Sequence, residues 1–164
     1  KTLMFIVSSL CLSALISCGG SEEQKEEQIK IGGNKTESKK TETTKTISAA
    51  ETIDLTNKGV GPITEVTLNS DIDQTMVSAG AEVFKAKCTA CHKIGKKFIG
   101  PAPNGILERR TPEWIMNMIL DPEGMVANDP LAKQLLIEHN GSPMANQSLT
   151  QEEARSILEY FRTL

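Results

Sequence analysis

One pentapeptide carries the residues best suited to chemistry: Cys88-Thr89-Ala90-Cys91-His92. Two cysteines separated by two residues and followed directly by histidine form the pattern that attaches c-type haem. Each thiol would form a thioether with one haem vinyl group, and the histidine would reach the iron from the same side. We therefore predict one covalent haem c on Cys88 and Cys91, with His92 as an axial iron ligand. Two ordinary thiols beside a histidine are the alternative until the surrounding chain is considered.

A zinc site on Cys88, Cys91, His92 and His139 is a second interpretation of the same residues. Structural zinc takes four ligands in tetrahedral geometry. The adjacent Cys91 and His92 are poorly placed to bind one tetrahedral ion together, and His139 is remote in the chain. The spacing favours haem over zinc.

A helix that leads into the motif is predicted to hold it in place. Val77, Gly80 and Phe84 share one helical face in a helix that begins after Asp73 and runs to Cys88. Glycine inside a helix is costly unless another element packs closely against it. Gly80 therefore indicates a close contact with a second helix.

Three further helices are predicted after the motif. Thr111 caps the first, which ends at Asp121-Pro122, and the second runs from Pro130 to about Glu138. The last begins at Ser148 or Thr150. It presents an apolar stripe formed by Ala154, Ile157, Leu158 and Phe161.

Residues 73–164 resemble the class I cytochromes c. In that family the first and last helices cross at right angles and touch through a glycine and an aromatic residue. Gly80 and Phe84 stand where the family has these residues, and Ile157 and Tyr160 match the partner positions of the last helix. The resemblance implies an all-α cytochrome c fold, with four to five short helices wrapped around one covalently bound haem and the first and last helices crossing.

The resemblance also implies support for the haem from residues after the motif. In the family, the carbonyl of a proline placed like Pro101 accepts a hydrogen bond from the haem histidine and fixes its tautomer. Arg109, Arg110 and Trp114 could bind a haem propionate. The alternatives are a plain turn at Pro101, and a solvated arginine pair beside a core tryptophan.

The second axial ligand is expected to be Met144. The family places its methionine in a loop just before the last helix, and Gly141-Ser142-Pro143-Met144 is such a loop. Methionine paired with histidine marks electron-transfer cytochromes c and raises the reduction potential. The family usually has proline after this methionine, whereas this chain has Ala145. Met125 and His139 are the alternatives, and His139 is expected to be exposed at the end of a polar helix.

The N-terminal region is predicted to be an export signal. Residues 1–17 combine a positive start with a short apolar run, as in a signal peptide. Leu15-Ile16-Ser17-Cys18 resembles the bacterial lipobox, which implies that Cys18 is lipidated and anchors the mature chain. Several acyl chains give durable membrane attachment. An ordinary cleaved signal with an incidental cysteine is the alternative.

Two segments separate this signal from the cytochrome c domain expected at 73–164. Residues 18–52 are too poor in apolar residues to bury a core, so we predict a disordered, lipid-anchored tether. Residues 53–72 add scattered apolar residues and turn signals. We predict an extended lead-in there that lies against the domain, with further linker as the alternative.

The charge pattern bears on the kind of partner. A formal net charge of −3 argues against a nucleic-acid-binding protein. Lysines nevertheless surround the haem motif: Lys85, Lys87, Lys93, Lys96 and Lys97. Such a patch steers an acidic partner, and an ordinary solvated lysine face is the alternative.

Together these features predict a one-electron carrier in a respiratory chain and not an enzyme. It would shuttle electrons between membrane or periplasmic redox partners, with a terminal oxidase and nitrous-oxide reductase as candidates. We expect a monomer that is exported and lipid-anchored to a bacterial membrane facing the periplasm, with the outer membrane or cell surface as further locations. The alternative is a haem enzyme or a gas- or peroxide-reactive protein, which needs an open iron position and a polar distal pocket.

Overall fold

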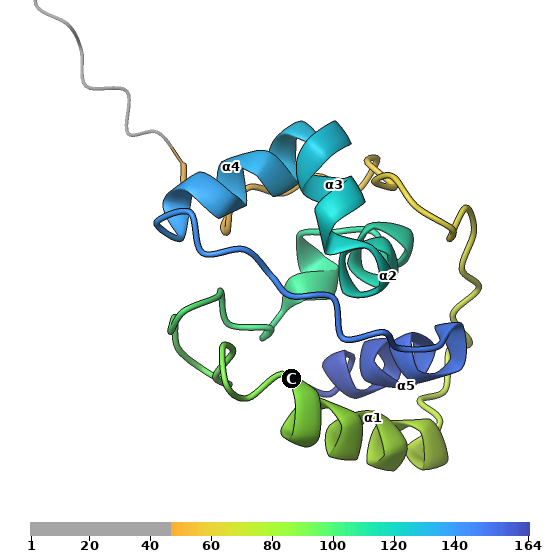
Figure 1. Cartoon of the computed structure of the whole chain (residues 1–164). Coiled ribbons are helices and arrows are strands. Elements are labelled where there is room, and N and C mark those ends of the chain that lie inside the picture. Colours follow the sequence, from red (N-terminus) through yellow and green to blue (C-terminus); the bar gives the residue numbers. More distant parts are fainter. Residues whose placement is uncertain (1–46) are drawn as a thin grey trace, which may run out of the picture. The chain divides into compact units, whose positions relative to one another are not determined.

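The computed structural model describes residues 47–164, and every regular element in this range is helical (Figure 1). The elements are α1 (Gln74–Lys87), a short 3₁₀ helix η1 (Ile106–Glu108), α2 (Pro112–Leu120), α3 (Pro122–Asn128), α4 (Pro130–Glu138) and α5 (Gln151–Phe161). The predicted all-α fold is confirmed. Within this described range, no helix has the length and apolar character needed to cross a membrane. The predicted signal peptide, Cys18 and the tether up to residue 46 lie outside it.

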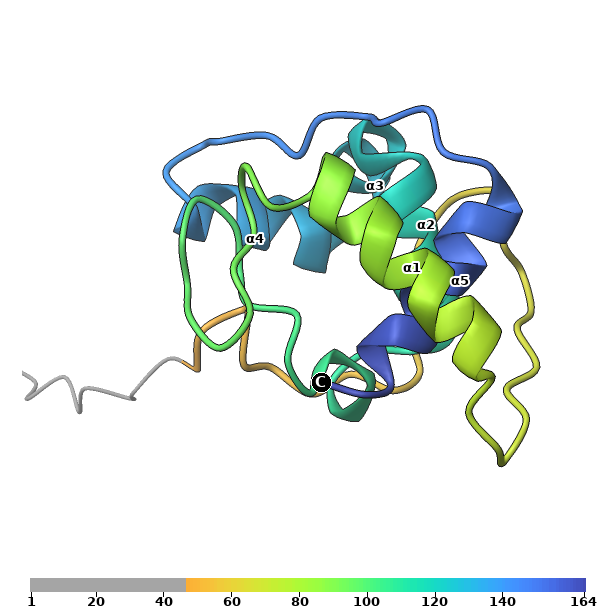
Figure 2. The same ribbon diagram turned by 90° about the horizontal axis from the view of Figure 1, so that it is seen from below.

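The first and last helices pack directly on each other (Figure 2). Their approach depends on Gly80, where a Cβ atom would lie 2.0 Å from the backbone oxygen of Ser156 in α5. One turn later, the centroid of the Phe84 ring lies 5.8 Å from that of Tyr160 and 5.7 Å from that of Phe161. These distances are typical of favourable tilted and edge-to-face aromatic pairs. The predicted contact of the glycine and the aromatic residue with the last helix is confirmed.

Side-chain caps set where the helices begin. Asp73 before α1 and Thr111 before α2 accept hydrogen bonds from backbone N–H groups of the first turn, as expected from the sequence. Of the two caps considered for α5, Thr150 is the one used, and it forms a capping box with Glu153. Local side-chain chemistry thus determines these helix starts.

Helix α3 is absent from the sequence prediction, which ended a helix at Asp121-Pro122. The Asp121 side chain accepts a hydrogen bond from the Gly124 amide at 3.0 Å, so it caps a new helix. Pro122 occupies the first position of that helix, where its missing N–H costs nothing. The two residues that end α2 therefore also begin α3.

Residues 53–72 run extended along the helices (Figure 1). The buried Asn117 of α2 holds this segment. Its Oδ1 accepts a hydrogen bond from the Ile63 amide at 2.9 Å, and its Nδ2 donates to the carbonyls of Ile63 and Lys58 at 2.9 and 3.0 Å. One side chain therefore satisfies three backbone groups that have no sheet partner, and Ile63 is buried as a result.

The end of the same segment is held by a buried carboxylate. Glu159 of α5 is 1% exposed and accepts a hydrogen bond from the Asp73 amide at 2.9 Å. Arg155 and Arg162 each pair with it at 2.6 Å. Burial acts to raise the pKa of Glu159, but the Asp73 amide and the two arginines outweigh burial and lower it. The carboxylate is therefore charged where α1 begins.

Contacts with the helices begin before the predicted boundary at residue 53. The Ser48 hydroxyl and the Ala49 amide donate to the Glu138 carboxylate at 2.9 and 2.6 Å. The Ala49 amide is the main cause of a lowered pKa at Glu138. Arg110 donates to the carbonyls of Ala49 and Thr52. The composition of residues 48–52 predicts a tether, because composition cannot reveal partners that lie far away in the chain.

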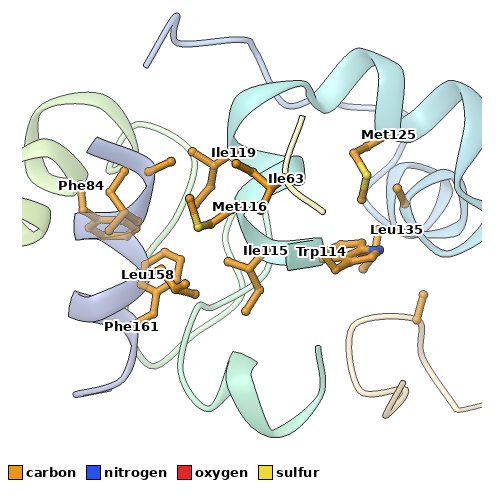
Figure 3. Packing of buried hydrophobic residues seen from close by; sticks show 14 residues of the cluster. Ile63, Phe84, Trp114, Ile115, Met116, Ile119, Met125, Leu135, Leu158 and Phe161 are labelled. Atoms are coloured by element: carbon orange, nitrogen blue, oxygen red, sulfur yellow. The ribbon is translucent and has the colours of Figure 1, made fainter. Parts of the chain in front are cut away.

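The buried apolar side chains form one cluster, part of which lies between α5 and α2 (Figure 3). Helix α2 supplies Trp114, Ile115, Met116 and Ile119, and α5 supplies Ala154, Ile157, Leu158 and Phe161. Trp114, Ile115 and Ile119 also line the cavity described below. The cluster thus fixes one wall of the candidate site.

Candidate haem site

The cysteine motif continues directly from α1. Cys88 ends the helix, and its amide still donates to the Phe84 carbonyl at 2.9 Å. The amides of Cys91 and His92 both donate to the Cys88 carbonyl, at 3.0 and 2.8 Å. One tight turn therefore gathers both thiols and the imidazole, and the contact between α1 and α5 fixes where that turn lies.

A largely apolar cavity lies beside the motif. Its lining comes from the motif and the loop after it, from α2, and from α4 together with the segment between α4 and α5. Representative members are, in that order, Cys88, Cys91, His92 and Pro101; Trp114, Ile115 and Met118; and Leu135, His139 and Met144. The structure thus brings together the thiols, the imidazole and a thioether around one apolar space.

His92 is held in one orientation by the loop that follows it. Its Nδ1 lies 2.8 Å from the Pro101 carbonyl oxygen, which can only accept, so Nδ1 carries the hydrogen and donates. Its Nε2 then keeps a lone pair for a metal. Gly100 packs against the ring so closely that a Cβ atom would lie 2.4 Å from Cε1 of His92. The absence of a side chain at Gly100 therefore leaves space for the His92 ring.

Two methionines line the cavity, Met118 from α2 and Met144 from the loop before α5. Met125 does not line it. The Met125 side chain is fully buried, and its Sδ lies 3.1 Å from the Val60 amide of the lead-in. Of the two methionines considered as the second axial ligand, only Met144 therefore lines the cavity.

The residues considered for propionate binding mostly have other partners. Trp114 has a single N–H, and it donates that hydrogen to Asp129 at 3.2 Å. Arg110 is buried, donates to three backbone carbonyls and stacks 5.2 Å from the Trp114 ring. Arg109 lines the cavity but donates to the carbonyls of Gly105 and Asn104, both at 3.0 Å. As placed, Trp114 has no hydrogen left to donate to a propionate.

His139 lies in the cavity wall, and the prediction that it is exposed is wrong. Its side chain is buried, and its Nδ1 lies 2.8 Å from the Ile99 carbonyl oxygen. The spacing of buried residues along α4 indicates that His139 is buried. His139 follows Ala132 by seven residues and Leu135 by four, so it continues their buried helical face.

The donor set and the walls of the cavity fit haem c. Both thiols are free, and burial raises the pKa of Cys88, so that thiol is protonated at neutral pH. Thioether formation adds such a thiol across a vinyl group. In residues 47–164, no three His, Cys, Asp or Glu side chains are grouped to hold a metal ion. The zinc interpretation therefore finds no ligand set in this part of the chain.

Replacing Gly100 with alanine tests the packing around His92. The added methyl group would force the ring or the loop to move, so we expect the haem-loaded protein to lose about 1–3 kcal/mol of stability. Denaturant unfolding followed at the main haem absorption band measures this. The control is Gly95→Asn in the same loop, where φ is +75° and a side chain would meet open space. Equal stability of the two variants would contradict the steric account.

Comparisons with known proteins agree with this geometry. The family model described as cytochrome c matches residues 77–164. A solved cytochrome c from Rhodothermus marinus is 40% identical, with a TM-score of 0.61 over 71% of this chain and 92% of that chain. An engineered form of that protein, Rma TDE, is also 40% identical, with a TM-score of 0.61 over 71% and 93%. No match was found among curated proteins.

The matched region begins within α1, at residue 77, and continues through α5, so it includes the whole cysteine motif. It spans more than half of the chain, and the solved relative is covered almost completely. The domain therefore carries covalent haem c, with Cys88 and Cys91 as the attachment motif. This chain belongs to the cytochrome c family.

Proposed function

We propose that this protein is a one-electron carrier of a respiratory chain with a Met/His-ligated haem. Family membership supports electron transfer as the activity. The observation that carries the finer proposal is that His92 and Met144 line the same cavity from different segments. In Figure 1 the blue segment between α4 and α5 runs above the green loop that follows α1. A thioether and an imidazole can therefore face one metal from separate parts of the chain.

The residues have distinct tasks in this proposal. Bound haem supplies an iron that changes its oxidation state by one electron. Pro101 keeps the His92 ring oriented through Nδ1 and makes it a better ligand. The soft thioether of Met144 favours the ferrous state and raises the reduction potential. The apolar walls limit access of water to the site.

Replacing Met144 with alanine should abolish the weak near-infrared band that arises from methionine ligation of ferric iron. The reduction potential should fall because the thioether no longer favours ferrous iron. The ferrous variant should also bind carbon monoxide readily, since one iron position becomes open. Absorption spectra and redox titration of the haem-loaded protein measure all three effects.

Two methionine variants serve as controls for this test. Met118→Leu changes the same cavity, and Met125→Ala changes the core beside the lead-in. Both should keep the band, although Met125→Ala should cost about 2–5 kcal/mol of stability. If the band remains in Met144→Ala and is lost in one of the controls, the assignment of Met144 as the axial ligand is wrong. Ready binding of carbon monoxide by the unmodified ferrous protein would favour the alternative haem enzyme or ligand sensor.

We infer that redox partners dock on a lysine-rich surface around the motif. Four of its lysines have exposed side chains: Lys85, Lys87, Lys96 and Lys97. Lys93 instead donates to the Thr89 carbonyl at 2.8 Å and lies 5.3 Å from the centroid of the half-exposed Phe98 ring. Positive charge around exposed apolar side chains suits an acidic partner, for which a terminal oxidase and nitrous-oxide reductase are candidates.

Charge reversal tests this surface with small redox reagents. In the Lys85→Glu/Lys96→Glu double variant, oxidation of the ferrous protein by ferricyanide should be slower at low salt, because the anion is no longer attracted. The difference should shrink as ionic strength rises. Lys133→Glu, an exposed lysine of α4, controls for the change in net charge. Equal slowing per added negative charge in both variants would contradict a localised docking surface.

We further propose that the protein is exported and attached to a bacterial membrane through lipid on Cys18, facing the periplasm. The lipobox-like run Leu15-Ile16-Ser17-Cys18 supports this. Cells expressing the full chain should incorporate labelled palmitate into it, and Cys18→Ser should prevent labelling while Cys11→Ser should not. Labelling that survives Cys18→Ser would rule out Cys18 as the anchor.

A further inference from the structure

His139 is a buried residue of the cavity wall that the proposed function does not use. It is 5% exposed, and its Nδ1 must carry a hydrogen because the Ile99 carbonyl oxygen only accepts. Its Nε2 has no hydrogen-bond partner, and among residues 47–164 it is the one buried side-chain nitrogen or oxygen in that position. Leaving a buried polar atom unpaired is costly. This nitrogen therefore points to a ligand in the cavity.

His139 is not placed to bind the iron opposite His92. Its Nδ1 is anchored to the Ile99 carbonyl, whereas Nδ1 of His92 is anchored to the Pro101 carbonyl. Carbonyls two residues apart lie within about 7 Å of each other. Two histidines on opposite faces of one metal would need acceptors much farther apart, because two rings and two hydrogen bonds would lie between them. His139 therefore belongs beside the edge of the haem.

The polar groups at the edge of a haem are its two propionates. The Trp114 side chain donates its single N–H to Asp129, and Arg110 is buried and donates to three backbone carbonyls. The charged groups nearest His139 in the chain are Glu138 and Lys97, and Lys87, Arg109 and Arg110 also line the cavity. The Glu138 carboxylate is occupied by Ser48 and Ala49, and Lys97 donates to the Glu138 carbonyl at 3.2 Å. Arg109 donates to the Gly105 and Asn104 carbonyls, and the Lys87 side chain is exposed. Nε2 of His139 is the buried nitrogen of the cavity wall that still lacks a partner, so it is available to a carboxylate.

We propose that His139 holds a haem propionate, with Nε2–H donating to a propionate oxygen while Nδ1–H donates to the Ile99 carbonyl. The ring then carries both hydrogens and a positive charge, which the propionate balances. Because this positive charge offsets a negative charge close to the iron, it disfavours the ferric state and raises the reduction potential. The proposal requires haem in the cavity but does not depend on Met144 as the axial ligand.

Asparagine and glutamine separate the roles of the two ring nitrogens. The amide nitrogen of His139→Asn replaces Nδ1 and keeps the bond to Ile99, whereas that of His139→Gln replaces Nε2 and reaches into the cavity. We expect the midpoint potential to be highest in the unmodified protein, intermediate in H139Q and lowest in H139N. The propionate bending band in resonance Raman spectra should shift most in H139N. If the unmodified protein shows the near-infrared band of methionine ligation, that band should remain in both variants.

The results that would contradict the propionate proposal differ from those that would contradict Met144 as the axial ligand. The proposal would be overturned if H139N had the same midpoint potential and propionate bending band as the unmodified protein. It would also be overturned if H139N and H139Q changed these two quantities equally. Absence of the near-infrared band from the unmodified protein, together with its appearance in both variants, would place His139 in iron ligation and overturn the proposal as well. If neither variant folds, ¹⁵N-histidine NMR of the unmodified ferrous protein decides. Two protonated ring nitrogens on His139 are expected, and a singly protonated ring would contradict the proposal.

Discussion

The close approach of α1 and α5 is the contact on which the haem site depends. The approach exists because Gly80 has no side chain, and a methyl group there would overlap the backbone oxygen of Ser156. One turn before Cys88, the Phe84 ring is held by Tyr160 and Phe161. Since Cys88 ends α1, this packing decides where both thiols lie. The contact between α1 and α5 thus positions covalent haem attachment, and Phe84 and Phe161 from this contact also line the cavity.

The site also depends on polar side chains that bind the extended segment before α1. Within residues 47–164, this segment has no neighbouring strand to satisfy its backbone groups. Asn117 and Glu113 of α2 bind backbone groups of Ile63 and Val66, and Glu138 at the end of α4 binds the amide of Ala49. Each supplies partners that an extended segment otherwise lacks. Ala50, which follows Ala49, reaches the lining of the cavity. The segment that contains Ala49 and Ala50 therefore helps to complete the haem site.

The loop after the motif joins the two sides of the cavity. Within three residues it offers its Pro101 carbonyl to His92 and its Ile99 carbonyl to His139. Gly100 between them leaves space for the His92 ring. His92 after the motif and His139 after α4 therefore each donate an Nδ1 hydrogen to a carbonyl of this loop. In our proposals, this arrangement leaves Nε2 of His92 for the iron and Nε2 of His139 for a propionate.

The sequence by itself determined the features that depend on short spacing: the haem motif, the helix caps at Asp73 and Thr111, and the glycine and aromatic residue of α1. Each is decided by residues within a few turns of one another. Tertiary structure alone decided the burial of His139, the contacts of residues 48–52 and the engagement of Trp114 with Asp129. These depend on hydrogen-bond partners brought together by folding. The sequence shows the same arginine or histidine whether the partner of that side chain is a backbone carbonyl, a propionate or water. Only the packed chain distinguishes these partners.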